Sequence, residues 1–494
     1  MLTSRSIALI GLLLVTAALV TLPIRQTDGI VMHGNAPIKK ATVRWQGECE
    51  RTITDSRGRF RLRDRLGAHR VTAYASGYRI ASAEHGIGRL TLRMQALPDS
   101  DNRDYEWIEP HPDPAKPNNC ANCHAEIHRE WQSSAHAASA VNSKFLSLFD
   151  GDGKHPTWNA RKEHPDGAAV CAACHVPTLR SASLDYDIRE AKADARSGIH
   201  CDACHKVTDV PADKLGLLFG RDALEWLRPT AGDAITYGPL DDAVRPGESF
   251  AYMPVYRQSR YCGACHEGIV FGVHAYGTYS EWLESPAKKQ GKQCQDCHMA
   301  PTGTLTNIAP RKGGVERRPE TLASHAMPGA TAAMLRRAVS MQVATRIEKN
   351  DRVLEIEIVA NHVGHRVPTG YVDRHLVLVV KAAAADANHV VDLTRGERLP
   401  QSAGAWSGLP GRIYAKRLIG EKDRTPTPFW LPVERVDDTR LFPGQPDRRT
   451  FAFPASTKRA TVELWHRRFW AEVAESRGWR DNDTLIASAI VTWD

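Results

Sequence analysis

The stretch "SGIHCDACHK" (197–206) places Cys201 and Cys204 three residues apart and directly before His205. The same C-x-x-C-H pattern occurs four more times, as "CANCH" (120–124), "CAACH" (171–175), "CGACH" (262–266) and "CQDCH" (294–298). Ten of the 11 cysteines in this chain of 494 residues therefore lie in five equivalent motifs. The chemistry of this repeated motif determines how the middle of the chain can fold.

The histidine after each pair distinguishes between the kinds of site that a C-x-x-C pair can form. Zinc sites normally combine two pairs per ion, so five pairs leave one over, and zinc gives no reason for the histidine. A redox dithiol would explain one pair but not five. With 21 histidines in 494 residues, a histidine after every pair is improbable by chance, whereas C-x-x-C-H is the attachment signature of haem c. The sequence therefore predicts five covalently bound c-type haems.

Each motif supplies the groups that such a haem requires. Two thiols three residues apart can reach the two vinyl groups on one edge of the ring, and the adjacent histidine can ligate the iron. The cysteines expected to bind haem are Cys120, Cys123, Cys171, Cys174, Cys201, Cys204, Cys262, Cys265, Cys294 and Cys297. The expected proximal iron ligands are His124, His175, His205, His266 and His298.

The formal charge of +8 is not concentrated in a basic tract, because lysine and arginine are mixed with acidic residues along the chain. Each haem brings about −2 from its propionates, while the ring and iron contribute about +1 when ferric and 0 when ferrous. The loaded protein would carry about +3 when oxidised and about −2 when reduced. The basic residues therefore mostly neutralise propionates, and we expect no nucleic-acid partner.

The N-terminus has the pattern of an export signal, since Arg5 precedes a mostly apolar run over residues 7–24. This run is long for a cleaved signal and short for a spanning helix, which needs about 20 apolar residues. We interpret residues 1–25 as a signal peptide or an N-terminal membrane anchor, and slightly favour the anchor. In both cases the body of the protein is expected at the periplasmic or extracellular face.

Residues 26–98 alternate between apolar and polar side chains in short runs, at 41–45, 48–54, 58–63, 69–75 and 88–94. Turns with Gly and Asp separate the runs, so we expect a small β-sandwich. Cys49 falls in the second run and is expected to be a buried small apolar residue. "TDSRGRFRL" (54–62) and "VTAYASGY" (71–78) resemble the carboxypeptidase regulatory-like (transthyretin-like) sandwich, which implies an accessory module without chemistry of its own.

Strand patterns return near the C-terminus, at 354–360, 375–384, 449–455, 460–470 and 485–494. All five motifs lie before them, in residues 99–338, where strand signals are weak and the helical stretches, such as 213–227 and 330–339, are short. The predicted fold class is multidomain. It comprises an N-terminal β-sandwich (26–98), a loop- and helix-rich pentahaem cytochrome c domain (99–338), and a C-terminal β-sandwich (339–494) that supplies a loop to the haem domain.

Five segments resemble the multihaem cytochrome c superfamily that includes hydroxylamine oxidoreductase and the tetrahaem cytochrome of ammonia oxidisers. They are "EIHREWQSSAHA" (126–137), "GIHCDACHK" (198–206), "QCQDCHMAP" (293–301), "SHAMPGA" (324–330) and "GHRVPTG" (364–370). The resemblance covers about residues 120–375. It implies distal iron ligands at His136, His325 and His365, and also at His200 and His274.

Because His200 adjoins Cys201, it would have to ligate a neighbouring haem rather than its own. Other candidates for distal ligands are His128, His155 and His164, and Met299 or Met327 could replace one histidine.

The first and fourth motifs begin an internal repeat. "CANCHAEIHREWQSSAHA" (120–137) and "CGACHEGIVFGVHAYGTYSEWLESPA" (262–287) both continue from C-x-x-C-H to E-W-x-x-S. The second copy has Ala287 where the first has His136. The second and third motifs are close along the chain, as are the fourth and fifth, so the spacing predicts two close haem pairs and a more separate haem at 120–124.

"VANHVGHRVPTGYVDRHLVLVV" (359–380) should connect two strands of the C-terminal sandwich through a stiff loop. Gly364 and Gly370 permit unusual backbone angles, and Pro368 fixes its own. Such a loop can hold His365 at the fixed reach that an iron ligand requires, with His362 facing away. The alternative is a plain hairpin with two surface histidines.

The sequence leaves three functions open. The first is electron transfer outside the cytoplasm through five haems, mostly with two histidine ligands, between redox partners of quinol oxidase or cytochrome type. The second is a multihaem oxidoreductase acting on a small nitrogen or sulfur compound, which needs one iron with an open position. The third is a subunit of a cytochrome filament, because exposed sandwich edges can pair with other chains and form an oligomer. We expect a carrier without catalytic residues.

Overall fold

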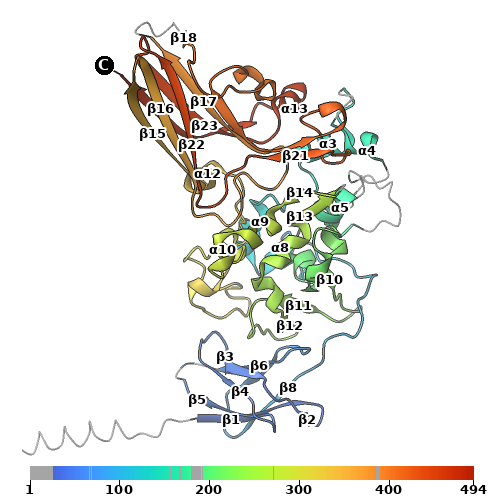
Figure 1. Ribbon diagram of the computed structural model, residues 1–494. Helices are drawn as coiled ribbons and strands as arrows, with labels where there is room; N and C mark the ends of the chain where they lie inside the picture. The colour runs from blue at the N-terminus through green and yellow to red at the C-terminus, as the bar shows by residue number, and fades with distance from the viewer. Residues whose placement is uncertain are drawn as a thin grey trace, which may run out of the picture. The chain divides into compact units, whose positions relative to one another are not determined.

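The computed structural model describes residues 26–65, 67, 69–154, 158–165, 170–179, 188, 191, 193–270, 272–384 and 390–493 (Figure 1). The predicted signal or anchor over residues 1–25 and the reserve ligand His155 lie outside the described residues. Within the described part, none of the helices has the length and apolar character needed to cross a membrane.

Two compact units make up the chain. The first unit combines Met1–Arg103 with two later segments, Arg228–Met253 and Pro310–Arg318. The second unit contains Asp104–Leu227, Pro254–Ala309 and Pro319–Asp494, and therefore holds all five motifs together with the C-terminal strands.

The N-terminal strands of the first unit form two sheets around one core. One sheet has the order β2 (Ala36–Pro37), β1 (Gln26–His33), β5 (Arg59–Arg63), with β8 (Leu90–Arg93) parallel to β1. The other has the order β4 (Arg51–Ile53), β3 (Thr42–Trp45), β6 (Arg70–Tyr74), β7 (Ala81–Glu84). Val31, Val43, Trp45, Leu62 and Leu92 are almost completely buried between them. Alternation along β1, β3, β5 and β8 places these residues on one face of each strand.

The two later segments are bound to this first unit by buried ion pairs. Residues 228–253 form the parallel strands β11 (Ile235–Gly238) and β12 (Ser249–Tyr252). Asp242 is fully buried and pairs with Arg317 at 2.8 Å and with Arg44 at 3.3 Å. The N-terminal sandwich therefore holds two segments that come from within the sequence of the haem domain.

The prediction that Cys49 is a buried residue within a strand is wrong. Cys49 is exposed and lies in the connection before β4, which begins at Arg51. Gly47 has a φ of +85° and turns the chain directly after β3. The strand pattern misled because this connection continues the apparent alternation of the neighbouring strands.

Short helices and loops dominate the first part of the second unit, and no long helix occurs among its described residues. The helices are α2 (Ala125–Gln132), α3 (Ser143–Asp150), α4 (Ala160–Glu163), α5 (Val170–His175), α6 (Ala193–Arg196), α7 (Cys201–Cys204), α8 (Ser259–His266), α9 (Thr278–Glu284), α10 (Pro286–Lys289), α11 (Gln295–His298) and α12 (Ala332–Ala338), with the 3₁₀ turn η1 (Cys120–Asn122). The predicted helix near 330–339 is confirmed as α12.

The predicted helix over 213–227 is wrong. This segment forms two 3₁₀ turns, η3 (Ala212–Lys214) and η4 (Gly220–Asp222), and ends in β10 (Glu225–Trp226), which pairs with β9 (Val207–Asp209). Gly216 and Gly220 have φ values of +80° and +49°, which a helix does not accommodate.

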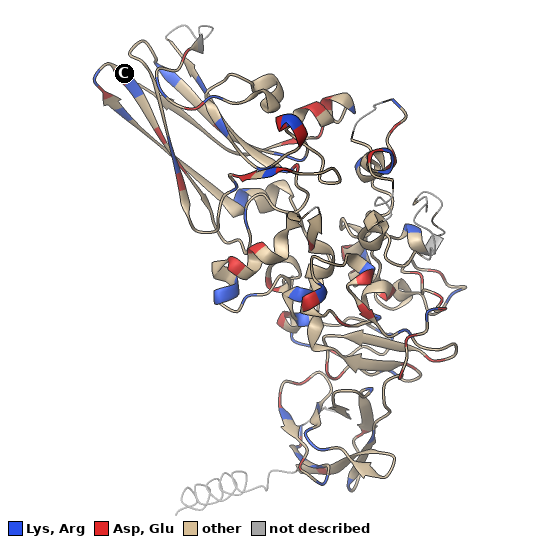
Figure 2. Ribbon diagram, turned by 45° about the vertical axis from the view of Figure 1, so that its right-hand side comes forward, with Lys and Arg blue, Asp and Glu red and all other residues tan. Residues whose placement is uncertain are grey.

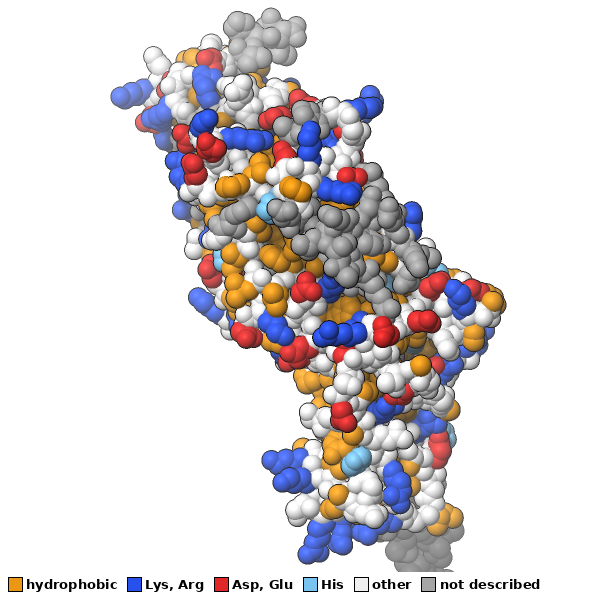
Figure 3. All heavy atoms as spheres, turned by 90° about the vertical axis from the view of Figure 1, so that its right-hand side faces the viewer, with side chains coloured by type: hydrophobic (Ala, Val, Ile, Leu, Met, Phe, Trp, Pro, Cys, Tyr) orange, Lys and Arg blue, Asp and Glu red, His pale blue; other side chains and the backbone are white. Residues whose placement is uncertain are grey.

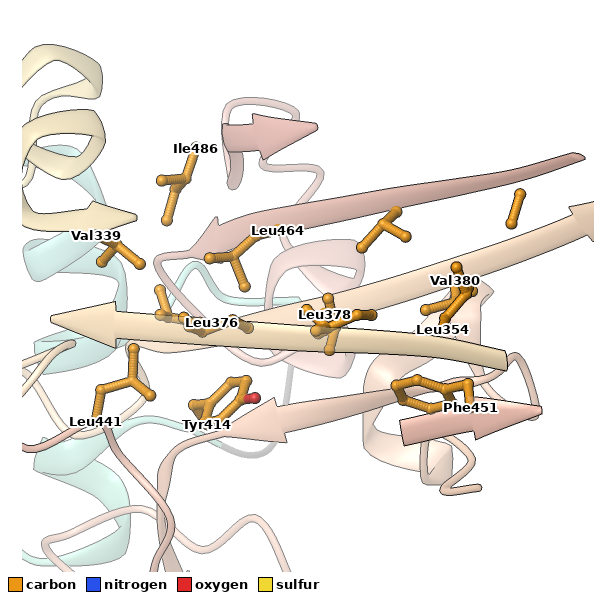
Figure 4. Packing of buried hydrophobic residues seen from close by; sticks show 14 of the residues in the cluster. Val339, Leu354, Leu376, Leu378, Val380, Tyr414, Leu441, Phe451, Leu464 and Ile486 are labelled. Atoms are coloured by element: carbon orange, nitrogen blue, oxygen red, sulfur yellow. The ribbon is translucent and has the colours of Figure 1, made fainter. Parts of the chain in front are cut away.

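The C-terminal strands form two sheets that face each other. A three-stranded sheet has the order β15 (Val339–Glu348), β16 (Asp351–Ala360), β22 (Pro446–Pro454), and a five-stranded sheet has the order β18 (Val390–Val391), β17 (His375–Ala383), β23 (Arg459–Arg467), β24 (Asp483–Thr492), with β19 (Gly411–Tyr414) beside β17. Figure 4 shows Val380 of β17 beside Leu354 and Phe451, and Leu376, further along the same strand, near Tyr414.

The other face of β17 is also buried, which explains its unbroken apolar sequence. Val377 and Val379 pack in a second cluster with Trp470 and with Leu148 and Trp158, which belong to the segment between the first two motifs. The C-terminal sheets and this part of the haem region therefore share a hydrophobic core.

Candidate haem centre

Each C-x-x-C-H motif forms one helical turn. The backbone N–H of the histidine donates to the carbonyl of the first cysteine at 2.9 Å in the motifs of His124, His205 and His298. One turn brings both thiols to the same side of the helix, with the histidine directly after them. No disulfide links the cysteines, all of which the structure describes. This geometry fits the attachment of a haem at each motif.

Two of the predicted proximal histidines have the hydrogen bonds that metal ligands usually have. The Nδ1 atom of His124 lies 2.7 Å from the carbonyl oxygen of Ile308, and that of His298 lies 2.8 Å from the carbonyl oxygen of Pro328. A ligating histidine usually donates its second ring N–H to a carbonyl or carboxylate, which fixes the ring. These contacts leave Nε2 available to iron.

Two of the predicted distal histidines face proximal histidines at a spacing that fits iron. The ring centroids of His136 and His266 are 6.2 Å apart, and those of His365 and His298 are also 6.2 Å apart. With metal–nitrogen bonds of about 2 Å, two imidazoles on opposite sides of one metal have centroids roughly 6 Å apart. The residues therefore fit two irons that are each held between two histidines.

A third predicted distal ligand, His325, lies close to the proximal His124. Burial is the main cause that lowers the pKa of His325 to about 4; a hydrogen bond with the carbonyl of Ala323 opposes this shift, and the nearby charge of His124 adds to it. A neutral imidazole is the form that binds a metal. Since its pKa lies well below 7, His325 is neutral at physiological pH.

The rings of His365 and His136, the two candidates that lie 6.2 Å from proximal histidines, also form contacts through Nδ1. In His365 this atom lies 2.9 Å from the carbonyl oxygen of Arg366, and in His136 it lies 3.0 Å from the sulfur of Met327. Burial lowers the pKa of His365 to about 4 and also lowers that of His136. Both rings are therefore neutral and present Nε2.

The structure places His200 and His274 differently. His274 lies on β14 (Val273–Gly277), where its half-exposed ring forms a contact of 2.6 Å with the buried carboxylate of Glu267. His200 is fully buried at the start of α7, with its ring edge-on to Trp107 at 6.0 Å between centroids. Their roles as ligands stay predictions.

The reserve ligands have other surroundings. His128 is buried and its Nε2 lies 3.3 Å from Nδ1 of His111, a residue that the sequence patterns did not single out. His164 ends α4 and Met299 ends α11. The ring of Phe145 stacks on that of the predicted proximal His175, with 3.7 Å between the ring centroids.

The repeated E-W-x-x-S segments make equivalent contacts. The indole N–H of Trp131 donates to the carbonyl of Ile199 at 2.8 Å, and that of Trp282 donates to the carbonyl of Lys292 at 2.9 Å. Ile199 and Lys292 each stand two residues before the first cysteine of a motif. Each tryptophan thus fixes the approach to a second motif, 201–205 or 294–298.

The backbone repeats the same pattern. The N–H of Ile199 donates to the carbonyl of His136 at 3.1 Å, and the N–H of Lys292 donates to the carbonyl of Ala287 at 3.0 Å. His136 and Ala287 occupy the same position in the two copies. The haem region therefore contains a two-motif module twice, and the motif at 171–175 lies in a long insertion within the first copy.

Contacts between thiols show which motifs are neighbours. Hydrogen bonds between thiols raise the pKa of Cys201, through Cys120, and the pKa of Cys262, through Cys294, well above the usual range. The two motifs of each module therefore lie side by side. The prediction of a separate haem at 120–124 is wrong, because the insertion lengthens the chain between two motifs that are adjacent in space.

The motif at 171–175 has a different neighbour from the one that spacing predicted. A hydrogen bond with Cys265 raises the pKa of Cys174 well above its usual range, followed by the effect of burial. This motif therefore borders the motif at 262–266. Spacing along the chain correctly predicted that the fourth and fifth motifs are neighbours. It did not predict that the second motif borders the fourth.

The glutamate of each E-W-x-x-S segment contacts a stretch that carries a predicted distal histidine, His325 or His365. Glu130 accepts a hydrogen bond from the backbone N–H of His325 at 2.7 Å. Glu281 accepts one from the hydroxyl of Thr369 at 2.7 Å and pairs with Arg440 at 2.5 Å, and both charged side chains are 7% exposed. The repeat in the sequence pointed to these residues, but not to their role.

Replacing Glu281 by Ala should destabilise the second unit by about 2–3 kcal/mol, because it leaves the buried Arg440 with Asp438 as its remaining partner. Chemical denaturation of the loaded protein measures this change. The matched control is Glu355→Ala, which removes an exposed ion pair with Arg346 and should leave the midpoint nearly unchanged. Equal midpoints for the two variants would contradict the role of Glu281.

Comparison with known proteins agrees with this geometry. Residues 119–206, which contain three of the motifs, match the family model "Cytochrome c554 and c-prime". The structure is similar to that of a penta-heme cytochrome c552 from Thermochromatium tepidum, with 23% sequence identity and a TM-score of 0.55, over 76% of this chain and 97% of that chain. None of the curated proteins matches the chain. In its fold and its motifs the chain is therefore similar to multihaem c-type cytochromes.

Proposed function

We propose that this protein transfers electrons outside the cytoplasm through five covalently bound c-type haems, most of them with two histidine ligands. The observation that carries the proposal is the 6.2 Å spacing of His136 with His266 and of His365 with His298. Haem c supplies a one-electron redox centre when it is bound. Histidines on both sides of an iron leave no position for a substrate.

The order of the motifs in space supports a continuous path. Within the two modules, Cys120 neighbours Cys201 and Cys262 neighbours Cys294. The charge of Cys265 raises the pKa of Cys204 in addition to the effect of burial, so the third motif approaches the fourth. The motif at 262–266 therefore borders three others, and we infer a path that branches there.

Two tyrosines fix the third motif beside the fourth. The hydroxyls of Tyr256 and Tyr261 both donate to the carbonyl of Cys204, at 2.6 Å and 2.9 Å. Tyr261 belongs to α8, the helix that carries the fourth motif. A rigid connection of this kind keeps neighbouring redox centres at constant separation, as a carrier requires.

The mixture of charged residues in the described part of the chain supports the proposal that nucleic acid is not a partner. Basic and acidic residues are interspersed along the ribbon in Figure 2 and over much of the face in Figure 3. Large single-sign patches would be expected on a protein that binds nucleic acid. We propose other redox proteins as partners, of quinol oxidase or cytochrome type, at the periplasmic or extracellular face. The apolar N-terminal run would direct or anchor the protein there.

A second candidate function, oxidoreductase chemistry on a small nitrogen or sulfur compound, would use the haem at 171–175. Tyr371 and Asp373 are both deeply set, and burial raises the pKa of each well above its usual range. The charge of Cys171 also acts on Tyr371, which places this protic pair near the motif. Such a pair could supply protons if the iron of His175 had an open position.

Low-temperature EPR of the fully oxidised protein distinguishes the two functions. Electron transfer through irons with two axial histidines predicts low-spin ferric signals that account for all haems. A high-spin signal equal to one haem, together with binding of CO by the reduced protein, would favour the oxidoreductase. High-spin signals from two or more haems would contradict the proposed ligation.

A further inference from the structure

Arg374 lies in the loop between the distal ligand His365 and strand β17, and the loop is built around its guanidinium group. The Nη1 atom donates to the carbonyl of Thr369 at 3.2 Å. Gly370 has a φ of +84°, and a Cβ atom there would lie 2.8 Å from Nη1. A glycine at this position therefore lets the guanidinium fold back against the loop, where its direction is fixed.

This guanidinium has no carboxylate partner among the described residues. Arg374 is partly buried, and an arginine remains charged in a protein, so a counter-charge would stabilise it. The adjacent Asp373 interacts with Tyr371 instead, so the two side chains diverge. Burial and the nearby Arg468 both lower the pKa of Arg374, which means that the surroundings add positive charge rather than compensate for it.

The contacts of Thr369 place Arg374 beside the second module, because its carbonyl accepts from Arg374 at 3.2 Å and its hydroxyl donates to Glu281 at 2.7 Å. Burial is the main cause that lowers the pKa of His266 to about 3 and that of His365 to about 4, and the charge of Arg374 contributes to both shifts. His266 is the proximal histidine of the fourth motif, and His365 faces the proximal His298 of the fifth. The guanidinium is therefore close to both haem positions of the second module.

We propose that Arg374 binds a propionate of a haem attached at 262–266 or 294–298. The inference rests on the proposed function, since it requires covalent haems at these motifs. Propionates are the anions that haem brings into the protein, and the planar fork of arginine matches a carboxylate with two parallel hydrogen bonds. The C-terminal loop would then hold the second module at two points, the iron through His365 and a propionate through Arg374.

The test is the replacement of Arg374 by Gln in the full, haem-loaded chain. An unpaired propionate favours ferric iron, so the equilibrium constant for reduction of one or two haems should fall on the order of tenfold, which is about 59 mV for one electron. Spectroelectrochemical titration measures this shift, and the haem count should stay that of the unmodified chain. The matched control is Arg448→Gln, which removes an exposed arginine paired with Glu357 at 2.7 Å and should change every equilibrium constant less than twofold.

Unchanged reduction in the Arg374→Gln variant would overturn the propionate contact. If this variant fails to accumulate, Arg374→Lys keeps the charge but loses the fork, and it should shift a propionate bending band in the resonance Raman spectrum; an unchanged band would overturn the contact. Potentials of the unmodified protein that depend on added phosphate would also overturn it, in favour of an exchangeable anion. A chain that carries no covalent haem would instead refute the proposed function.

Discussion

Replacing His365 by Ala should convert one haem from low-spin to high-spin and make that haem reactive toward CO, while the others keep their spectra. The ring centroids of His365 and His298 are 6.2 Å apart with the planes inclined by 17°, so the variant would remove one of the two proposed ligands of a single iron. Covalent attachment through Cys294 and Cys297 is not affected. Low-temperature EPR and the optical spectrum of the CO adduct measure the result.

The control for this prediction is His362→Ala in the same loop. His362 is exposed with a φ of +53°, as expected for a residue that faces away from the haem. Its replacement should leave all signals unchanged. An unchanged spectrum in the His365 variant, or the same defect in both variants, would refute the assignment.

Deleting all residues after Val339 should cause a larger defect than the loss of His365. Leu148 and Trp158 of the insertion pack against β17 and Trp470, so the deletion exposes them to water. It also removes Arg440, the partner of the buried Glu281. We therefore expect poor accumulation of this truncated chain, whereas the point variant keeps its fold.

Replacing both Cys201 and Cys204 by Ser should lower the covalent haem content by one per chain. The two thiols are the proposed attachment points of one haem, and removing both would leave no thioether bond. The alkaline pyridine haemochrome of the purified protein gives the ratio of haem to protein. His205→Ala should keep the full ratio, because it removes an iron ligand and not a thioether.

Cys49→Ser provides the matched control for the cysteine variants. Cys49 is the one cysteine outside the motifs and is exposed in the first unit. Its replacement should leave the haem ratio unchanged. Retention of the full ratio in the Cys201/Cys204 variant would show that this motif does not bind haem covalently.

The strands were largely predictable, because alternation of apolar and polar side chains is a local signal. The runs at 375–384 and 460–470 correspond to β17 and β23. The prediction of a helix over 213–227 was wrong. Its apolar spacing resembled that of a helix, but Gly216 and Gly220 have positive φ values, which a helix does not adopt. The prediction that Cys49 is buried in a strand was wrong for a related reason, because the turn after Gly47 continues the alternating pattern of the neighbouring strands.

The motifs themselves were evident from the sequence, but their arrangement was not. Which thiols meet depends on the insertion that separates Trp131 from Ile199, and a distance along the chain does not report such a fold. The role of Glu281 depends on a loop far along the chain, at Thr369. The two copies of E-W-x-x-S were the signal that could have pointed to it.

The central claim is that five haems are bound covalently to one chain. The most direct test is the intact mass of the denatured protein, purified from a host that exports and matures c-type cytochromes. We predict the mass of the polypeptide plus five haems. A mass that corresponds to four or fewer haems, after complete export and maturation, would contradict the account.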